Sequence, residues 1–141
     1  MRYLAIDYGL KRIGLAVCDA EEIIVSPLCQ IASDPKNLSK AIEQIVSLIQ
    51  ENQIEAIIMG LPLNMDDSEG QQAKCTREFS NQLQEKISIP LHFQDERLSS
   101  AAADELLAGS GLSFKKRKEK RDMLAACDIL QEFLYQKTEK L

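Results

Sequence analysis

Histidine, tryptophan and closely spaced cysteines are scarce in this sequence of 141 residues, and their scarcity excludes several kinds of site. There is one histidine, His92, which we interpret as an ordinary strand residue, and there is no tryptophan. The four cysteines are scattered, without a Cys-x-x-Cys pair, so neither a zinc site nor a disulfide framework is expected. A site for a hard metal needs only carboxylate oxygens and is not excluded.

Long apolar runs are absent as well. No stretch approaches the roughly 20 apolar residues that cross a membrane. The first residues, 1–7, form a strand-like pattern that contains an acid, which is unlike the apolar core of a signal peptide. We therefore expect a cytoplasmic protein without a membrane partner, and the length predicts one domain over residues 1–141.

Basic residues are fewer than acidic ones, which gives a net charge of −5, but many of them are concentrated in one segment. Residues 115–121, here called the basic segment, read Lys-Lys-Arg-Lys-Glu-Lys-Arg and carry +5, which leaves −10 on the rest of the chain. Contact with phosphate depends on such a local patch more than on the total charge. Taken alone, a basic run is more often a solvated connector.

Apolar runs and turn residues predict five strands and four helices. Short turns join the first three strands, over 2–6, 13–18 and 22–31, which implies antiparallel hairpins. After them we expect helices and strands to alternate. The first is a helix opened by Asp34 and Pro35, followed by a strand over 54–60 and a helix with Ala73, Phe79, Leu83 and Ile87 inward. An edge strand over 89–93, limited by Pro90, comes next. A helix from Ser99 or Ser100 to 109–111, a polar connector to about Lys120 and a last helix over 121–137 complete the chain.

This order of elements predicts an α/β fold, with a mixed five-stranded sheet (three antiparallel strands, then alternating helix and strand) covered by helices on both faces. The crossovers place the carboxyl ends of the first, fourth and fifth strands at one edge, where ligands of such sheets bind. Residues at that edge are therefore the candidates for a functional site.

Acids follow two of these strands and head the last helix. Asp7 ends the first strand, and Asp95 and Glu96 follow the fifth. Asp122 shares one helix face with Ala126, Ile129 and Phe133, whereas Asp128 falls on a more polar face and is expected to face solvent. Each acid also has an ordinary explanation, since acids are common in turns and at helix N-termini.

Carboxylates that converge without bases repel one another unless cations lie between them. Mg²⁺ or Mn²⁺ suits such a site, and two ions about 4 Å apart can activate water and stabilise the leaving oxygen in phosphodiester cleavage. The expected ligands are Asp7, Glu96 and Asp122, with Asp95 as an alternative to Glu96. Bases flanking the site would contact phosphates: Lys11, Arg12, Lys115, Lys116, Arg117, Lys118, Lys120 and Arg121. Arg97 holds either Asp95 or a phosphate.

Four short motifs in this order resemble those of the YqgF family. They are Ala5-Ile6-Asp7-Tyr8-Gly9 with Lys11-Arg12-Ile13-Gly14, then Gly60-Leu61-Pro62-Leu63-Asn64-Met65-Asp66, then Asp95-Glu96-Arg97-Leu98-Ser99, and finally Asp122 with Ala125-Ala126 and Ile129-Leu130. The resemblance implies a ribonuclease-H-like nuclease, either of Holliday-junction-resolvase type or acting on the precursor of 16S ribosomal RNA. It also implies a carboxylate triad at Asp7, Glu96 and Asp122, and a cytoplasmic role in ribosome biogenesis. Asp67 and Ser100 depart from the family pattern, where glycine and threonine are frequent.

The expected function is hydrolysis of phosphodiester bonds by a metal-dependent nuclease, most simply in processing the 5′ end of pre-16S rRNA. The nearest alternative is a Holliday junction resolvase, which would need a two-fold dimer; the sequence is compatible with a monomer or a homodimer. A non-catalytic RNA-binding factor is a third possibility. A nucleotide-binding lobe of the actin and sugar-kinase type also begins with Asp-x-Gly, but that fold needs two lobes and this chain has the length of one.

Overall fold

The structure is a computed structural model that describes residues 1–62, 69–95 and 114–139, with the side chains of 114–123 and 139 not described. Its elements are, in order, β1 (Tyr3–Tyr8), β2 (Arg12–Cys18), β3 (Val25–Ala32), α1 (Leu38–Glu51), β4 (Ala56–Leu61), α2 (Gln71–Gln84), β5 (Leu91–Asp95) and α4 (Phe114–Glu139). The helix predicted from Ser99 or Ser100 to 109–111 lies outside the described residues.

All the described strands belong to one sheet, in the order β3-β2-β1-β4-β5. The pairs β1–β2 and β2–β3 are antiparallel, and β1–β4 and β4–β5 are parallel. The predicted mixed sheet is therefore confirmed, with the carboxyl ends of β1, β4 and β5 at one edge. Pro90 directly precedes β5, which is an edge strand as expected, since proline has no N–H to donate to a neighbouring strand.

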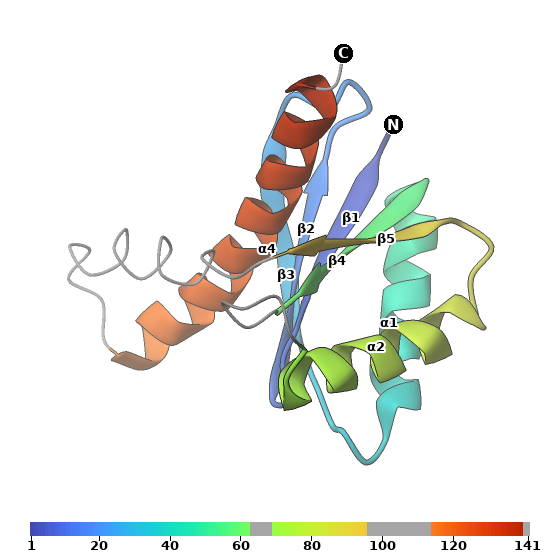
Figure 1. The fold of residues 1–141 in the computed structure, drawn as a ribbon, viewed down its shortest axis with the longest axis vertical. Coiled ribbons are helices and arrows are strands. Elements are labelled where there is room, and N and C mark those ends of the chain that lie inside the picture. The colour runs from blue at the N-terminus through green and yellow to red at the C-terminus, as the bar shows by residue number, and fades with distance from the viewer. Residues whose placement is uncertain (63–68, 96–113, 140–141) are drawn as a thin grey trace.

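Helices cover both faces of this sheet, and each face has its own core (Figure 1). On one face, Leu4 and Ile6 of β1 pack with buried residues of α1 and α2, among them Ile45 and Phe79. On the other face, Tyr3 and Ala5 pack with α4. Successive side chains of a strand point to opposite faces, so alternate residues of β1 belong to different cores.

Two predicted helix starts are wrong. The first helix begins at Leu38, with Asn37 as its N-cap, because Asp34 and Pro35 form a turn before it. In that turn the Asp34 carboxylate accepts the backbone N–H of Lys36 at 3.0 Å, a local bond that favours turns over helices.

The last helix begins at Phe114, so the basic segment lies inside it and not in a polar connector. Lysine, arginine and glutamate are good helix formers, and neither glycine nor proline interrupts residues 114–139.

Smaller differences affect the ends of other elements. β1 continues through Asp7 to Tyr8, and β5 runs to Asp95, so both acids lie within strands and do not follow them. α2 ends at Gln84, and Ile87 packs against the core from beyond the helix. Within the described ranges, no helix is both long and apolar enough to cross a membrane.

Candidate functional site at the sheet edge

Asp7 is the one acid of the predicted triad whose side chain the structure describes. It lies near the end of β1, half-buried, two residues after Ala5 on the strand. Ala5 belongs to the core beneath α4, so the alternation of strand side chains places Asp7 on the α4 face of the sheet.

Glycines lie on both sides of Asp7 in the sheet. Asp7 pairs with Gly14 of β2. On the other side the last pair of β1 and β4 is Ile6 with Met59, and the next residues along these parallel strands are Asp7 and Gly60. Both glycines are buried, and neither has a side chain, so the adjacent strands place no side chain beside the carboxylate in this row.

The same row of the sheet ends in an amide on each side. Gly14 pairs with Gln30 of β3, and Gly60 pairs with Gln94 of β5. Paired residues point to the same face, so both amides share the α4 face with Asp7. Gln94 is 7% exposed, one of the few buried polar residues of the described chain. The row Gln30, Gly14, Asp7, Gly60 and Gln94 is here called the Asp7 row.

Asp95 lies on the opposite face. It pairs with Leu61, which is two residues after Met59, and Met59 belongs to the core beneath α1 and α2. Phe93, two residues before Asp95, lies under the guanidinium of Arg77 from α2, 4.8 Å from the ring centroid. Asp95 and Asp7 are thus separated by the thickness of the sheet, which argues against Asp95 as a ligand shared with Asp7.

Glu96 and Arg97 lie outside the described residues, and so does the side chain of Asp122. The backbone of α4 nevertheless locates position 122. The ring of Phe133 contacts Tyr3 with centroids 5.2 Å apart, at the start of β1. Position 122 lies about 16 Å back along the helix, and Asp7 about 13 Å forward along the strand.

Figure 1 shows that α4 runs antiparallel to β1. The two lengths are similar, so position 122 is expected at about the level of the carboxyl end of β1. Helical spacing also places it on the same face of α4 as the buried Ala126 and Ile129. No group of three potential metal ligands is present among the residues whose side chains are described, a set that contains only Asp7 of the three predicted ligands.

Two of the predicted phosphate contacts lie at this edge, Lys11 in the turn between β1 and β2 and Arg12 at the start of β2. A Cβ on Gly9 would lie 2.5 Å from the carbonyl oxygen of Arg12, so the tight turn requires glycine there. The carbonyl of Lys11 accepts the N–H of Ser33 at 2.9 Å, which ties the turn to the end of β3. Lys11 is exposed, and Arg12 is partly buried and takes part in an interaction within the protein.

Contacts from α2 fix the end of β1 from the other face. The Gln72 side chain donates a hydrogen bond to the carbonyl of Tyr8 at 3.0 Å. The Tyr8 ring stacks on Phe79 at 4.5 Å, and burial raises the pKa of its hydroxyl, so Tyr8 is a neutral core residue at ordinary pH. Asp7 is therefore presented by a strand whose next residue is held in place by packing and hydrogen bonding.

The expectation that Asp128 faces solvent is wrong. Its side chain is partly buried on α4, and desolvation by this burial raises the pKa of the carboxyl. Helical phase distinguished its face from that of Asp122 but did not show how closely α4 packs on the sheet. The neighbouring Cys127 is buried, which raises its pKa to about 11, so it is an unreactive thiol.

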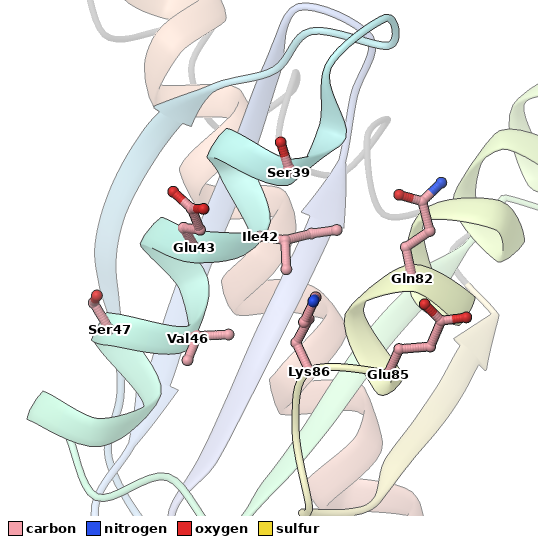
Figure 2. Close-up of a pocket in the computed structure, with 8 residues that line it drawn as sticks. All are labelled: Ser39, Ile42, Glu43, Val46, Ser47, Gln82, Glu85 and Lys86. Atoms are coloured by element: carbon pink, nitrogen blue, oxygen red, sulfur yellow. The ribbon is translucent and has the colours of Figure 1, made fainter.

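A hollow between α1 and α2 lies on the face opposite Asp7 and is separate from the candidate site. Ile42 and Val46 of α1 line it together with Glu85 and Lys86 after α2. Figure 2 shows the lining residues coming from α1, from α2 and from the residues directly after α2, with Glu43 and Ser47 directed away from α2. None of the predicted site residues lines it.

Three parts of this site were not found from the sequence, namely the two flanking glycines and Gln94. Gly14 and Gly60 belong to the quoted motifs, but their position beside Asp7 depends on the register of the strands. Gln94 alternates with His92 on its strand, a pattern that indicates a shared face without indicating which core that face meets.

Comparison with known proteins relates the whole chain to one family. The profile of the RuvX family, described as Holliday junction resolvase, matches residues 1–136. A protein of Chloroflexus aurantiacus with the name "Putative pre-16S rRNA nuclease" is 41% identical over 131 residues, covering 93% of this chain and 84% of that protein. A protein of Syntrophomonas wolfei with the same name is 42% identical over 139 residues, covering 95% and 94%.

Solved structures resemble the fold at much lower sequence identity. RuvC of Thermus thermophilus in complex with a Holliday junction aligns with a TM-score of 0.61 and 13% identity, covering 98% of this chain and 96% of that one. The Holliday junction resolvase of fowlpox virus aligns with a TM-score of 0.61 and 12% identity, covering 96% and 99%. These likenesses confirm the predicted ribonuclease-H-like fold, and the names of the relatives agree with the predicted hydrolase.

Proposed function

Because this chain belongs to the RuvX family, also called YqgF, we propose that it is a metal-dependent nuclease that uses Asp7, Glu96 and Asp122. The observation that carries this proposal is the setting of Asp7. A partly buried carboxylate lies on the α4 face, between two glycines, at the edge where three parallel strands end. A carboxylate in such a setting is suited to binding a cation more than to packing.

The donor set fits Mg²⁺ or Mn²⁺. Hard divalent cations prefer carboxylate oxygens and need few protein ligands, since phosphate and water complete their coordination. Asp7 would hold the metal from β1, Glu96 from the segment after β5 and Asp122 from α4. When bound, the metal would supply an activated water and stabilise charge on the leaving oxygen.

Support for the three acids differs in kind. Asp7 rests on its described environment, and Asp122 rests on the level and the helix face of its backbone position. For Glu96 the support is indirect, because Asp95 occupies the opposite face of the sheet. Alternation along an extended chain would return the next residue to the face of Asp7.

Nucleic acid is the proposed substrate, positioned by bases around the acids. Lys11 and Arg12 lie at the same edge, and the basic segment continues α4 beyond position 122. Arg97 would assist from the segment after β5. Contacts of this kind hold phosphates without reading the sequence of bases.

The favoured substrate is structured RNA, with processing of the 5′ end of pre-16S rRNA in the cytoplasm as the role. The curated relatives support this, since they are named for that RNA at about 40% identity. The second candidate is resolution of four-way DNA junctions, which the family description favours. Paired cuts in a junction would require a homodimer, whereas a single cut in RNA requires only a monomer.

The central test is substitution of Asp7 by asparagine. The variant keeps the size of the side chain but loses the charge, so we expect it to bind nucleic acid and to lose cleavage by at least a hundredfold. Purified protein with Mg²⁺ or Mn²⁺ would be incubated with pre-16S rRNA and with a four-way DNA junction in parallel, and its mass measured by light scattering.

Asp19→Asn is the matched control. Asp19 lies in the turn at the opposite end of the sheet, where its carboxylate accepts the N–H groups of Ile23 and Ile24, bonds that asparagine can also accept. This variant should cleave like the wild type. Equal cleavage by Asp7→Asn and wild type would refute the catalytic assignment, and binding without any cleavage would favour a non-catalytic RNA-binding factor.

A further inference from the structure

The buried amide of Gln94 needs an explanation that packing alone does not provide. It is 7% exposed, on an edge strand whose neighbouring residues His92, Phe93 and Asp95 are exposed. Burying an amide costs free energy unless its donors and acceptor find partners. The amide of Gln94 therefore needs polar partners, which either the protein or a ligand can supply.

Gln94 and Asp7 lie on either side of a residue that has no side chain. They occupy the Asp7 row two strands apart, on the same face, with Gly60 between them. Strands lie about 4.8 Å apart, so the two Cα atoms are separated by about 10 Å. Gly60 is buried and adds no side chain to this interval, whereas any other residue there would place a Cβ in it.

An amide at this place complements a carboxylate in chemical terms. Asp7 accepts hydrogen bonds or binds a cation, whereas the Gln94 NH₂ group donates to anionic oxygen. Glutamine is one of the side chains that contact nucleic-acid phosphates without sequence preference. Its lack of charge also leaves the cation affinity of Asp7 undisturbed, which a lysine or arginine at the same distance would reduce.

We propose that Gln94 is a positioning residue that binds a backbone phosphate of the nucleic acid across Gly60 from Asp7. This proposal rests on the function proposed above, because it places the phosphate in the same site. Gln94 takes no part in proton transfer; it fixes the phosphate relative to the carboxylate.

Two substitutions separate this role from a structural one. Gln94→Leu removes the donor and suits a buried place, and Gln94→Glu keeps the shape but directs negative charge at the phosphate. The control is His92→Leu, on the same strand and face, where the ring stacks on Phe133 with centroids 6.1 Å apart. Affinity would be measured with Ca²⁺ in place of Mg²⁺, using labelled RNA and a labelled four-way junction, beside single-turnover cleavage and thermal unfolding.

We expect Gln94→Glu to weaken binding at least tenfold and Gln94→Leu severalfold, with His92→Leu within twofold of wild type. At saturating protein, both Gln94 variants should also cleave more slowly. Wild-type affinity in both Gln94 variants would overturn the proposal. So would a loss that only follows a lowered unfolding temperature and appears equally in His92→Leu, because that result identifies a structural residue.

The two proposals fail in different ways. If the wild type binds but cleaves neither substrate, the proposed nuclease function is wrong, and the affinities of the variants still test whether Gln94 binds phosphate. If the wild type cleaves and the Gln94 variants bind and cleave normally, only the role of Gln94 fails. Absence of binding by the wild type would overturn both.

Discussion

Asp7 has glycine as its neighbour on both adjacent strands, and this arrangement has a cost. Glycine in a strand destabilises a protein by about 0.5–1 kcal/mol relative to alanine, because the unfolded chain is more flexible and no side chain packs. Two such residues beside one carboxylate are explained if the space they leave is used by a ligand.

Gly60→Ala tests that explanation at the scale of one residue. We expect cleavage to fall at least tenfold, since the added methyl group occupies the interval between Asp7 and Gln94. The unfolding temperature should stay the same or rise slightly, because alanine is the better strand residue. Single-turnover cleavage and calorimetry would measure the two effects.

Gly70→Ala is the matched control, since Gly70 lies at the start of α2 with a φ of −86° that alanine adopts readily. Its activity should remain within twofold of wild type. Normal cleavage by Gly60→Ala would mean that no ligand occupies the interval.

The site residues differ in how far the sequence alone predicted them. Asp7 was identifiable because it is an acid in an apolar strand, and a single strand carries that signal. The separation of Asp95 from Asp7 was not predictable, because it depends on strand register and on β5 reaching as far as Asp95. Gln94 was missed for the same reason, since its importance lies in what it faces across β4.

Among the elements, α4 differs most from expectation. Its first turns carry the basic segment, so those bases follow a helix and not a loose connector. Over seven helical residues they extend along about 10 Å. The backbone of this segment is helical, and it adjoins the helix position of Asp122.

Neutralising part of this helix tests its role as an element. We expect glutamine at Lys115, Lys116, Arg117 and Lys118 to weaken nucleic-acid binding, because glutamine keeps helix propensity and removes four charges. The slope of the logarithm of the binding constant against the logarithm of the salt concentration should become shallower by about 0.9 for each phosphate that the protein no longer neutralises. Affinity measured over a range of salt concentrations gives both values.

A variant with the same change in net charge is the control. Lys36, Lys40, Lys74 and Lys86 are exposed residues in or near α1 and α2, on the opposite face of the sheet, and would be replaced by glutamine together. This variant should keep the wild-type slope. Equal flattening in both variants would show that only total charge matters.

For the whole molecule, α4 alone among the described helices closes one of the two cores. Its far end is held by a cluster of polar contacts. Lys137 donates to Glu22 at 2.6 Å and to the Tyr3 hydroxyl at 2.9 Å, which links α4 to β1 and to the turn between β2 and β3. Global stability therefore depends on how well α4 docks.

Asp128 gives a measure of that docking through pH. Burial raises its pKa in the folded protein, so folding favours the protonated carboxyl, and stability decreases as the pH rises through the folded pKa. Asp128→Asn should therefore unfold at a higher temperature at pH 7, by on the order of 1–3 °C. The difference should vanish by about pH 3, where the aspartate is largely protonated in both states.

Glu132→Gln removes a carboxylate from an exposed position one turn further along α4. Calorimetry from pH 3 to pH 8 should show a smaller effect for this variant than for Asp128→Asn. A gain of equal size in both would attribute the stabilisation to net charge and not to burial.

At this scale the sequence predicted most of the fold. The order of the strands along the chain, the antiparallel start and the edge position of β5 follow from turn lengths and from Pro90, which are local signals. The depth at which α4 packs on the sheet was not predicted, because it depends on small residues of several strands, such as Ala5, Ala16 and Ala56.

The division of the second core between β1 and α4 has a consequence for synthesis of the protein. The ribosome makes β1 first, and more than a hundred residues separate it from α4. While the chain grows, one face of the sheet lacks its cover, and Asp7 lacks the helix expected to carry its partner Asp122. With the proposed triad, activity would begin only after the last helix has emerged and docked, so that an unfinished chain could not cut nucleic acid.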